Sequence, residues 1–182
     1  IAEYVRVSGA LTHLSLKANK LGDAGAEALA AGLKENQALK TLDLSGGQYS
    51  YESNDIGKKG AVALAGMLSV NGALTSINLR GNLLGTEGGC AIFNALRDNK
   101  DNKIASWDLS GQRLDAEAAK AIAEYVAVSG ALTSLDLSRN DIGGHYEQGK
   151  LVSTPEGPLA IADALRVNGA LTSVNLVRNQ LD

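Results

Sequence analysis

Residues 132–140 read Leu-Thr-Ser-Leu-Asp-Leu-Ser-Arg-Asn, a pattern that joins a short strand to a polar turn. Its apolar residues stand at the first, fourth and sixth positions, and the alternation between Leu135 and Leu137 is typical of a strand. Asn140 follows three residues after the last leucine. Because an asparagine side chain both donates and accepts hydrogen bonds, it can satisfy backbone groups in a turn. The pattern therefore predicts a strand that ends in an asparagine-stabilised turn.

The same pattern recurs along the whole chain. Its copies begin at residues 11, 39, 74, 104, 132 and 171, so the spacings are 28, 35, 30, 28 and 39 residues. The base period is 28 residues, and the longer units carry insertions. In the fourth copy Gln112 replaces the asparagine. The asparagines of the other copies are Asn19, Asn54, Asn82, Asn140 and Asn179.

Each strand pattern except the last is followed by an alanine-rich segment with helical spacing. In residues 118–126, Ile122 and Val126 stand four positions apart, which predicts a helix with one buried stripe. Several of these segments close at Asn-Gly or Ser-Gly pairs, where we expect the glycine to supply a left-handed C-cap. These glycines are Gly72, Gly130 and Gly169.

The pattern Leu-x-x-Leu-x-Leu-x-x-Asn with a helical second half resembles the leucine-rich repeat. The 28-residue period is similar to that of the ribonuclease-inhibitor subfamily, and the resemblance covers essentially the whole chain. It implies an α/β fold in which residues 1–182 form a single domain. That domain would be a right-handed αβ solenoid, a horseshoe segment with a parallel concave sheet and outer helices. Proteins with similar repeats bind other proteins, serve as sensor domains of receptors or activate small GTPases.

Elementary packing supports the stacking of these repeats. A 28-residue unit cannot bury its own apolar face, so each unit must pack against its neighbours. The asparagines are then expected to form a ladder that satisfies buried backbone groups in the turns. Because the side chain of Gln112 is one methylene longer, we expect the ladder to differ there. The predicted core leucines at the sixth strand position are Leu44, Leu79, Leu109, Leu137 and Leu176.

Composition argues against several classes of function. The net charge is −3 and the 17 lysines and arginines form no run, which disfavours nucleic acid as a partner. No apolar run approaches the ~20 residues of a membrane span. The lone Cys90 cannot form an internal disulfide and has no histidine near it in sequence, which favours a cytoplasmic location and an unreactive thiol. No motif indicates a cofactor, a metal ion or the active site of an enzyme.

The two ends of the sequence both fall inside a repeat. Residues 1–11 match residues 122–132 almost letter for letter, so the sequence opens within a helix. We therefore expect a segment of a longer array, with uncapped ends that associate head to tail. The apolar residues expected to be exposed there are Ile1, Val5, Val174, Leu176 and Leu181.

The concave face is the first candidate for a binding surface. Its strand positions are small, polar and mildly acidic, so a merely solvated face is the alternative. Asp108 and Asp136 fall on neighbouring strands roughly 5 Å apart, a spacing compatible with an acid pair or a cation site. A repeated structural aspartate is favoured, because nothing supplies a nucleophile beside them. The candidate contact residues are Asp43, Asn78, Arg80, Asp108 and Asp136, with Arg139 and Arg178 along one side.

Two insertions are the second candidate. They lie near residues 47–53 and 144–154, and each follows a strand, so both should emerge at the same edge of the solenoid. The two loops are expected to lie on the order of 15–30 Å apart. Tyrosine is a favoured contact residue, but local packing over the sheet edge is an equal alternative. The candidate residues are Tyr49, Tyr51, His145 and Tyr146.

Three functions are compatible with these features. A protein-binding module would use the concave face, the insertion loops or both. A regulator that activates a small GTPase is one alternative, and a structural or sensor segment of a larger receptor is the other. An enzyme is the least favoured class.

Overall fold

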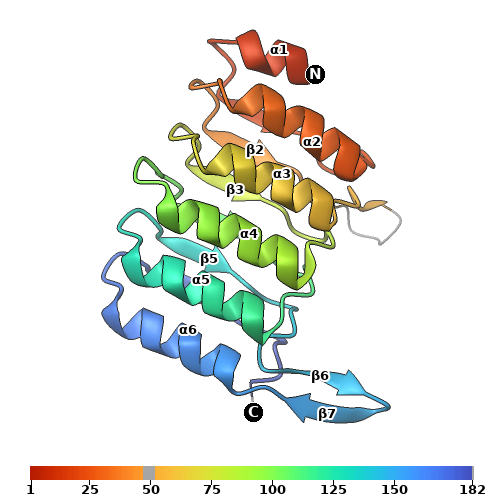
Figure 1. Ribbon diagram of the computed structural model, residues 1–182, viewed down its shortest axis with the longest axis vertical. Coiled ribbons are helices and arrows are strands. Elements are labelled where there is room, and N and C mark those ends of the chain that lie inside the picture. The colour runs from red at the N-terminus through yellow and green to blue at the C-terminus, as the bar shows by residue number, and fades with distance from the viewer. Residues whose placement is uncertain (47–51, 182) are drawn as a thin grey trace.

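The computed structural model describes residues 1–46 and 52–181, in which strands alternate with helices. Figure 1 shows the helices stacked along the long axis, with the sheet as a second layer behind them. None of the described helices is both long and apolar enough to cross a bilayer. The helices are α1 (Ala2–Val7), α2 (Gly22–Leu33), α3 (Lys58–Leu68), α4 (Gly85–Asp98), α5 (Ala116–Val128) and α6 (Glu156–Val167). The strands are β1 (His13–Ser15), β2 (Thr41–Asp43), β3 (Ser76–Asn78), β4 (Ser106–Asp108), β5 (Ser134–Asp136), β6 (Gly144–Glu147), β7 (Lys150–Ser153) and β8 (Ser173–Asn175).

The repeat strands pair in the order of the sequence. Within the described residues, β1, β2, β3, β4, β5 and β8 form a six-stranded sheet in that order. All its pairs are parallel, and their register aligns equivalent positions, so that Leu14 lies opposite Leu42 and Leu135 opposite Val174. The structure therefore confirms the predicted αβ solenoid, in which helices cover one face of a parallel sheet.

The core lies between the sheet and the helices. Leu44, Leu79, Leu109 and Leu137 are each 0% exposed, as predicted. Leu176 is only half-buried, in contrast to the prediction, because no described helix follows β8 to cover it. The sixth strand position is thus fully buried wherever a repeat is packed on both sides.

An aromatic cluster fills the middle of this core. The ring of Phe93 lies 5.8 Å from that of Trp107 and 5.6 Å from that of Tyr125, measured between centroids. Gly89 of α4 allows the next repeat to approach closely, since a Cβ there would lie 2.8 Å from Leu114 Cδ2. The fluorescence of the chain's one tryptophan therefore reports on the core where α4 and α5 meet.

The asparagines after the strands form the predicted ladder. Asn140 Nδ2 donates to the carbonyl oxygens of Leu109 and Leu137 at 3.0 and 2.8 Å. Its Oδ1 accepts from the backbone N–H groups of Gln112 and Leu114 at 2.9 and 3.1 Å. Each rung thus ties one turn to the turn of the preceding repeat. The same donor arrangement recurs at Asn54, Asn82 and Asn179.

Gln112 keeps only half of this arrangement. Its Nε2 donates to the carbonyl oxygen of Leu79 at 2.5 Å, but its buried Oε1 has no hydrogen-bond partner in the described part of the chain. By analogy with Asn140, an asparagine here would accept from the N–H groups of Asn82 and Leu84. The extra methylene therefore costs this rung its acceptor function.

We expect Gln112→Asn to stabilise the fold by about 1 kcal/mol, because it restores an acceptor for buried N–H groups. Urea denaturation followed by Trp107 fluorescence measures the change. Gln112→Ala is the control and should destabilise, since it removes the donor as well. A Gln112→Asn variant less stable than the parent chain would show that this turn requires the longer side chain.

The helices end in a second asparagine ladder, which corrects the expectation for their C-caps. Asn71 Nδ2 donates to the carbonyl oxygens of Leu33 and Asn36 in the preceding repeat, at 2.9 and 3.0 Å. The side-chain amide, and not a left-handed glycine, satisfies the free carbonyl groups at the helix end. Equivalent bonds are made by Asn36, Asn99 and Asn168. The glycines predicted as C-caps all lack a positive φ: Gly72, Gly130 and Gly169.

The first helix also departs from expectation. Val5 is 1% exposed, because α1 packs on α2, whereas Ile1 is 73% exposed. At the other end of the described chain, Val174 and Leu176 are half-buried and Leu181 is 44% exposed. The prediction that Val5 is exposed is therefore wrong, and this residue belongs to the core.

Candidate protein-binding surface

The turns after the strands form one continuous edge of the solenoid, which we call the strand-exit edge. The backbone there bends through the left-handed region, with φ of +57° at Ala18, +67° at Gly111 and +58° at Arg139. Hydrogen bonds join neighbouring turns, as from the N–H of Arg139 to the carbonyl oxygen of Val177 at 2.8 Å. The edge is therefore a rigid platform. It comprises residues 17–20, 45–46, 52–55, 80–83, 110–113, 138–141 and 177–180.

The predicted acidic residues form a row across the sheet, on the face away from the helices, which we call the strand face. Asp43 Oδ1 accepts from the backbone N–H two residues later at 2.9 Å. Asp108 and Asp136 do the same at 3.0 and 2.8 Å. Asn78 repeats this bond at 2.9 Å. Each of these side chains closes the turn that follows its strand, so the row positions the strand-exit edge.

Asp108 and Asp136 lie opposite each other on β4 and β5, as expected. Both make further structural bonds. Asp108 Oδ1 accepts from the hydroxyl group of Ser110 at 2.7 Å, and Asp136 Oδ2 accepts from Asn175 Nδ2 at 2.9 Å. Among the described residues, no group of three His, Cys, Asp or Glu side chains could hold a metal ion. Turn closure therefore accounts for both aspartates.

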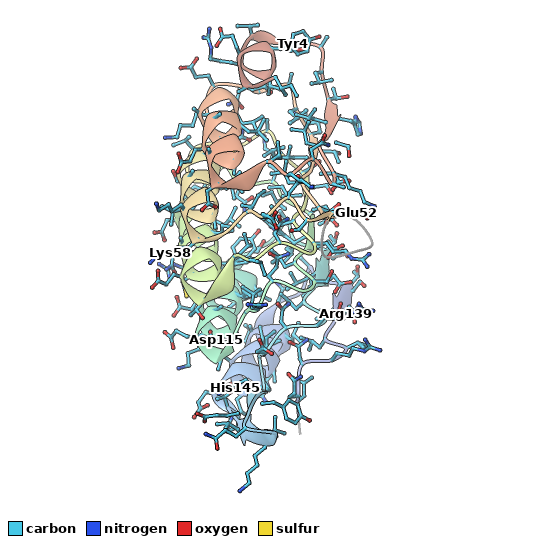
Figure 2. The ribbon with its side chains drawn as sticks, turned by 90° about the vertical axis from the view of Figure 1, so that its right-hand side faces the viewer. Tyr4, Glu52, Lys58, Asp115, Arg139 and His145 are labelled. Carbon is cyan, nitrogen blue, oxygen red and sulfur yellow. The ribbon has the colours of Figure 1, made fainter. Side chains whose placement is uncertain are left out.

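Arginines are the main cationic groups of the strand-exit edge. Arg80, Arg113, Arg139 and Arg178 are all exposed, and none forms an ion pair with another described residue. Figure 2 shows Arg139 on the strand side of the molecule, opposite Lys58 on the helix side. The structure thus brings the three predicted arginines to one edge and adds Arg113, which the sequence did not single out.

The second insertion is a β-hairpin and not an irregular loop. β6 and β7 pair antiparallel, with Tyr146 opposite Leu151 and His145 opposite Val152. Every residue from 145 to 153 is exposed. Figure 1 shows the hairpin projecting beyond the stacked repeats near the C-terminal end. The two candidate residues of this insertion therefore lie on adjacent positions of one projecting strand.

In the sequence, the first insertion separates residues 45–46 from residues 52–55 of the strand-exit edge. Tyr49 and Tyr51 lie outside the residues that the structure describes, so their role and the expected spacing between the two insertions remain predictions. At its C-terminal flank, the hydroxyl group of Ser53 donates to the carbonyl oxygen of Gly81 at 2.9 Å. This bond fixes the flank to the next repeat.

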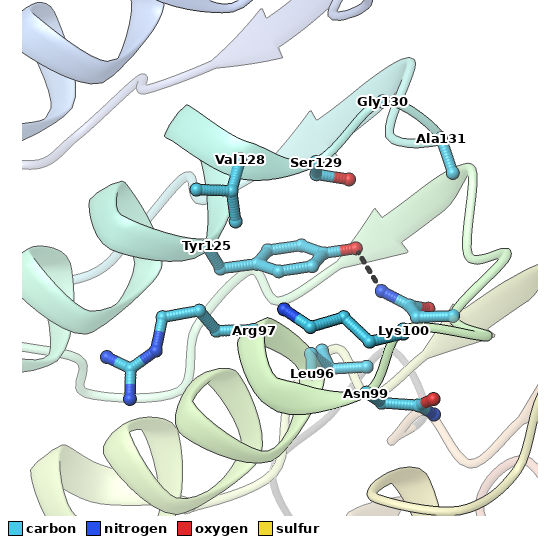
Figure 3. A pocket seen from close by; sticks show the side chains of 10 residues that line it. Leu96, Arg97, Asn99, Lys100, Tyr125, Val128, Ser129, Gly130 and Ala131 are labelled. Atoms are coloured by element: carbon cyan, nitrogen blue, oxygen red, sulfur yellow. Dashed lines mark hydrogen bonds between the residues drawn. The ribbon is translucent and has the colours of Figure 1, made fainter.

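A polar pocket of about 180 Å³ lies at the opposite edge, where α4 and α5 end (Figure 3). Ser129 occupies the position that an asparagine holds in the second ladder, and the ring of Tyr125 fills part of the space. Asn102 Nδ2 donates to the hydroxyl group of Tyr125 at 2.8 Å, and burial raises the pKa of this phenol. The pocket is therefore a gap in the second ladder that a neutral tyrosine partly closes.

Cys90 lies half-buried on α4. Burial raises the pKa of its thiol, and the carboxylates of Glu117 and Asp115 add to this effect. A thiol with a raised pKa is protonated at neutral pH and is a poor nucleophile. The site therefore supports the prediction of an unreactive cysteine.

Two features of this surface escaped the sequence analysis. The hairpin turn has φ of +49° at Gln148 and +79° at Gly149, as a type I′ turn requires, but Gln-Gly is a weaker signal than Asn-Gly. The left-handed conformation of Arg139 could have been inferred from Gly81 and Gly111, which occupy the same position in other repeats.

Comparisons with known proteins agree with this architecture. Residues 11–30, 52–65 and 132–144 match the family model described as Leucine Rich repeat. The structure of leiomodin-1 actin-binding site 2 is similar, with a TM-score of 0.64 and 20% identity over 91% of this chain and 85% of that chain. The structure of the tropomodulin C-terminal domain of Caenorhabditis elegans is also similar, with a TM-score of 0.65 and 14% identity over 91% of this chain and 89% of that chain. No curated protein matches in sequence. These findings support a leucine-rich repeat protein, and at such identities the structural likeness shows the fold alone.

Proposed function

We propose that this leucine-rich repeat protein is a protein-binding module whose contact surface is the β6–β7 hairpin together with the strand-exit edge and the adjoining strand face. The β6–β7 hairpin carries the proposal, because it is exposed throughout residues 145–153. Tyr146 is 67% exposed, and Leu151 and Val152 are each 37% exposed. A partner that packs against the hairpin would bury these apolar side chains.

The hairpin has the properties of a contact element. An isolated two-stranded hairpin is marginally stable in water, and packing against another surface stabilises it. Tyr146 and Leu151 are cross-strand partners, so their side chains share one face and form an apolar patch. The other face ends in Glu147 and Lys150, a pair of opposite charge. We therefore place the anchor of the interface on the Tyr146–Leu151 face, whereas His145 and Val152 lie on the other face with the charged pair.

A binding role accounts for this surface better than the other candidate functions. The hydroxyl group of Thr12 is hydrogen-bonded to His13 Nδ1 at 2.8 Å, but no third described group orients this imidazole as a catalytic triad requires, so we propose that the module has no enzymatic activity of its own. Activation of a small GTPase would use the same surface, whereas a structural spacer would not need it. The 28-residue period supports placement in the ribonuclease-inhibitor-like subfamily.

Actin is the first defined partner to test. The leiomodin-1 actin-binding site 2 has the same fold across 91% of this chain. Co-sedimentation with actin filaments and gel filtration with monomeric actin would each reveal a complex. A complex in either assay would identify actin as the partner. If neither assay shows a complex, crosslinking is the next way to find the partner.

Tyr146→Ser combined with Leu151→Ser is expected to weaken partner binding by at least about tenfold, because each lost anchor costs about 1 kcal/mol or more. A photo-reactive group placed at His145 first captures the partner, which is then purified so that Kd can be measured by fluorescence anisotropy. Circular dichroism should show an unchanged fold, since both side chains are exposed.

The matched control is Tyr4→Ser combined with Val167→Ser. It removes a tyrosine and a large aliphatic side chain that are 65% and 67% exposed on α1 and α6. This control should leave Kd unchanged. Equal losses in the two double variants, or the absence of any partner whose crosslinking depends on the hairpin, would contradict the proposal.

A further inference from the structure

We infer that Arg139 and Arg178 form a docking site for a segment of a partner protein that carries two neighbouring carboxylates. The inference deepens the proposed function and rests on it for the existence of a protein partner. Both arginines are exposed, stand side by side at the strand-exit edge in left-handed turn positions, and lack an ion-pair partner in the described part of the chain.

The two arginines occupy equivalent positions in adjacent repeats. Asp136 lies opposite Asn175 in the sheet, and each arginine follows three residues later. The two turns also touch, because the N–H of Arg139 donates to the carbonyl oxygen of Val177 at 2.8 Å. Neighbouring strands lie about 5 Å apart, so both guanidinium groups start from adjacent points of a rigid edge. Carboxylates at positions i and i+4 of a helix have a similar spacing of about 5–6 Å.

The backbone at these positions disfavours arginine. φ is +58° at Arg139 and +61° at Arg178, in the left-handed region that costs free energy for a residue with a Cβ atom. The same turn position holds Gly81 and Gly111 in the third and fourth repeats, both with φ of +67°. The fold therefore accepts glycine here, and it does not itself require an arginine in two consecutive repeats.

Charge adds a second cost to this arrangement, because two like charges on neighbouring strands repel each other. Three arginines on the described helices, Arg6, Arg97 and Arg166, each pair with a carboxylate. Asp136, the carboxylate nearest in sequence before Arg139, is already engaged through both oxygens, one with a turn N–H and one with Asn175. Both edge guanidinium groups are thus free for an external anion.

A carboxylate-bearing protein segment fits the pair better than a nucleic acid does. Guanidinium groups bind carboxylates in a bidentate geometry. A phosphate backbone needs a run of positive charge, whereas here Asp108 and Asp136 lie on the adjoining strand face and the whole chain carries a net charge of −3. A polypeptide can present carboxylates to the arginines and hydrogen-bond donors to the aspartates at the same time.

Fluorescein-labelled poly-L-glutamate is the probe, and fluorescence anisotropy at low ionic strength follows its binding. The parent chain is expected to bind with an affinity that falls as salt is added. Arg139→Gly combined with Arg178→Gly should weaken binding about tenfold, as the loss of two exposed ion pairs implies. The same variant should unfold at a temperature roughly 2–4 °C higher, because glycine relaxes both turns. The inference requires this loss of binding together with the gain in stability.

Two further variants serve as controls. Arg6→Gln combined with Arg166→Gln removes two arginine charges from helices and should leave probe binding nearly unchanged. Arg139→Lys combined with Arg178→Lys keeps the charge but loses the planar fork, so an intermediate affinity is expected.

Three results would overturn the inference. If the glycine variant and the helix control lose the same amount of probe affinity, net charge alone explains the effect. Tighter binding of an oligothymidylate than of poly-L-glutamate would assign the site to nucleic acid. A glycine variant less stable than the parent chain would give the arginines a structural role.

The hairpin variant separates this inference from the proposed function. Tyr146→Ser with Leu151→Ser leaves both arginines in place, so it should bind poly-L-glutamate as the parent chain does. One result would contradict the proposed function alone: the probe binds and the glycine variant weakens that binding, but no partner is found whose binding depends on the hairpin. The opposite result would overturn only the arginine site: a partner binds through the hairpin, but the glycine variant binds poly-L-glutamate as well as the parent chain does.

Discussion

Asn140→Ala is expected to lower the free energy of unfolding by about 3–5 kcal/mol. Asn140 is 2% exposed, and its side-chain amide bonds two backbone N–H groups and three carbonyl oxygens. Alanine would leave all of these groups without that partner in the interior of the stack. Each buried polar group left unpaired costs about 1–3 kcal/mol, so the loss should exceed that of an ordinary polar substitution.

Asn19→Ala is the matched control for this prediction. Asn19 is exposed, and its Nδ2 donates to a single carbonyl oxygen, that of Lys17, at 2.8 Å. The expected loss is under about 1 kcal/mol. Urea denaturation followed by Trp107 fluorescence and by far-ultraviolet circular dichroism gives both values. If both variants lose the same free energy of unfolding, the buried hydrogen bonds of Asn140 stabilise the fold no more than the exposed bond of Asn19 does.

The sheet and the first ladder could be predicted because the repeat encodes them many times over. Alignment of the copies already placed Ile77 beside Trp107 and Asn78 beside Asp108, which is the register of β3 and β4. An error of one residue in that alignment would have put all apolar side chains of a strand on the solvent face of the sheet. The departure at Gln112 could also be anticipated, since one methylene alters the reach of a side chain that must bridge two turns.

The helix ends could not be predicted in the same way. The pair Asn71-Gly72 fits a left-handed glycine cap as well as an asparagine cap, because both satisfy free carbonyl groups at a helix end. The choice depends on whether a neighbouring helix ends within reach of the amide. Here Leu33 and Asn36 of the preceding repeat present their carbonyl oxygens to it. Such a contact is tertiary, so the local sequence does not specify it.

The candidate site was predicted in part. Adjacency of Asp108 and Asp136 followed from the repeat, but the bonds that close their turns became evident only with the backbone conformation. Arg139 was placed on the correct edge, whereas its left-handed φ was not anticipated, because an arginine does not itself indicate that conformation and only the glycines at the same position of other repeats do. Tyr146 was expected in a loop, and its place in a hairpin gives it a fixed neighbour in Leu151.

Leu79→Ala is expected to destabilise the chain by about 2–5 kcal/mol, in the range for large-to-small changes in a packed core. The upper part of that range applies because the cavity has little freedom to collapse. Leu79 is 0% exposed, and its carbonyl oxygen accepts from both Asn82 Nδ2 and Gln112 Nε2. Two rungs of the ladder therefore hold the backbone in place around the lost side chain.

Leu83→Ala tests whether burial is the cause, since Leu83 lies in the same repeat but is 46% exposed. Its substitution should cost under about 1 kcal/mol. Because each repeat contacts only its neighbours, Leu79→Ala also weakens two interfaces, one on each side of the third repeat. If the stack still unfolds as one unit, Trp107 fluorescence and circular dichroism will give the same midpoint in this variant. Separate midpoints would mean that the third repeat divides the array, and an equal cost for the two leucines would mean that the core is assigned wrongly.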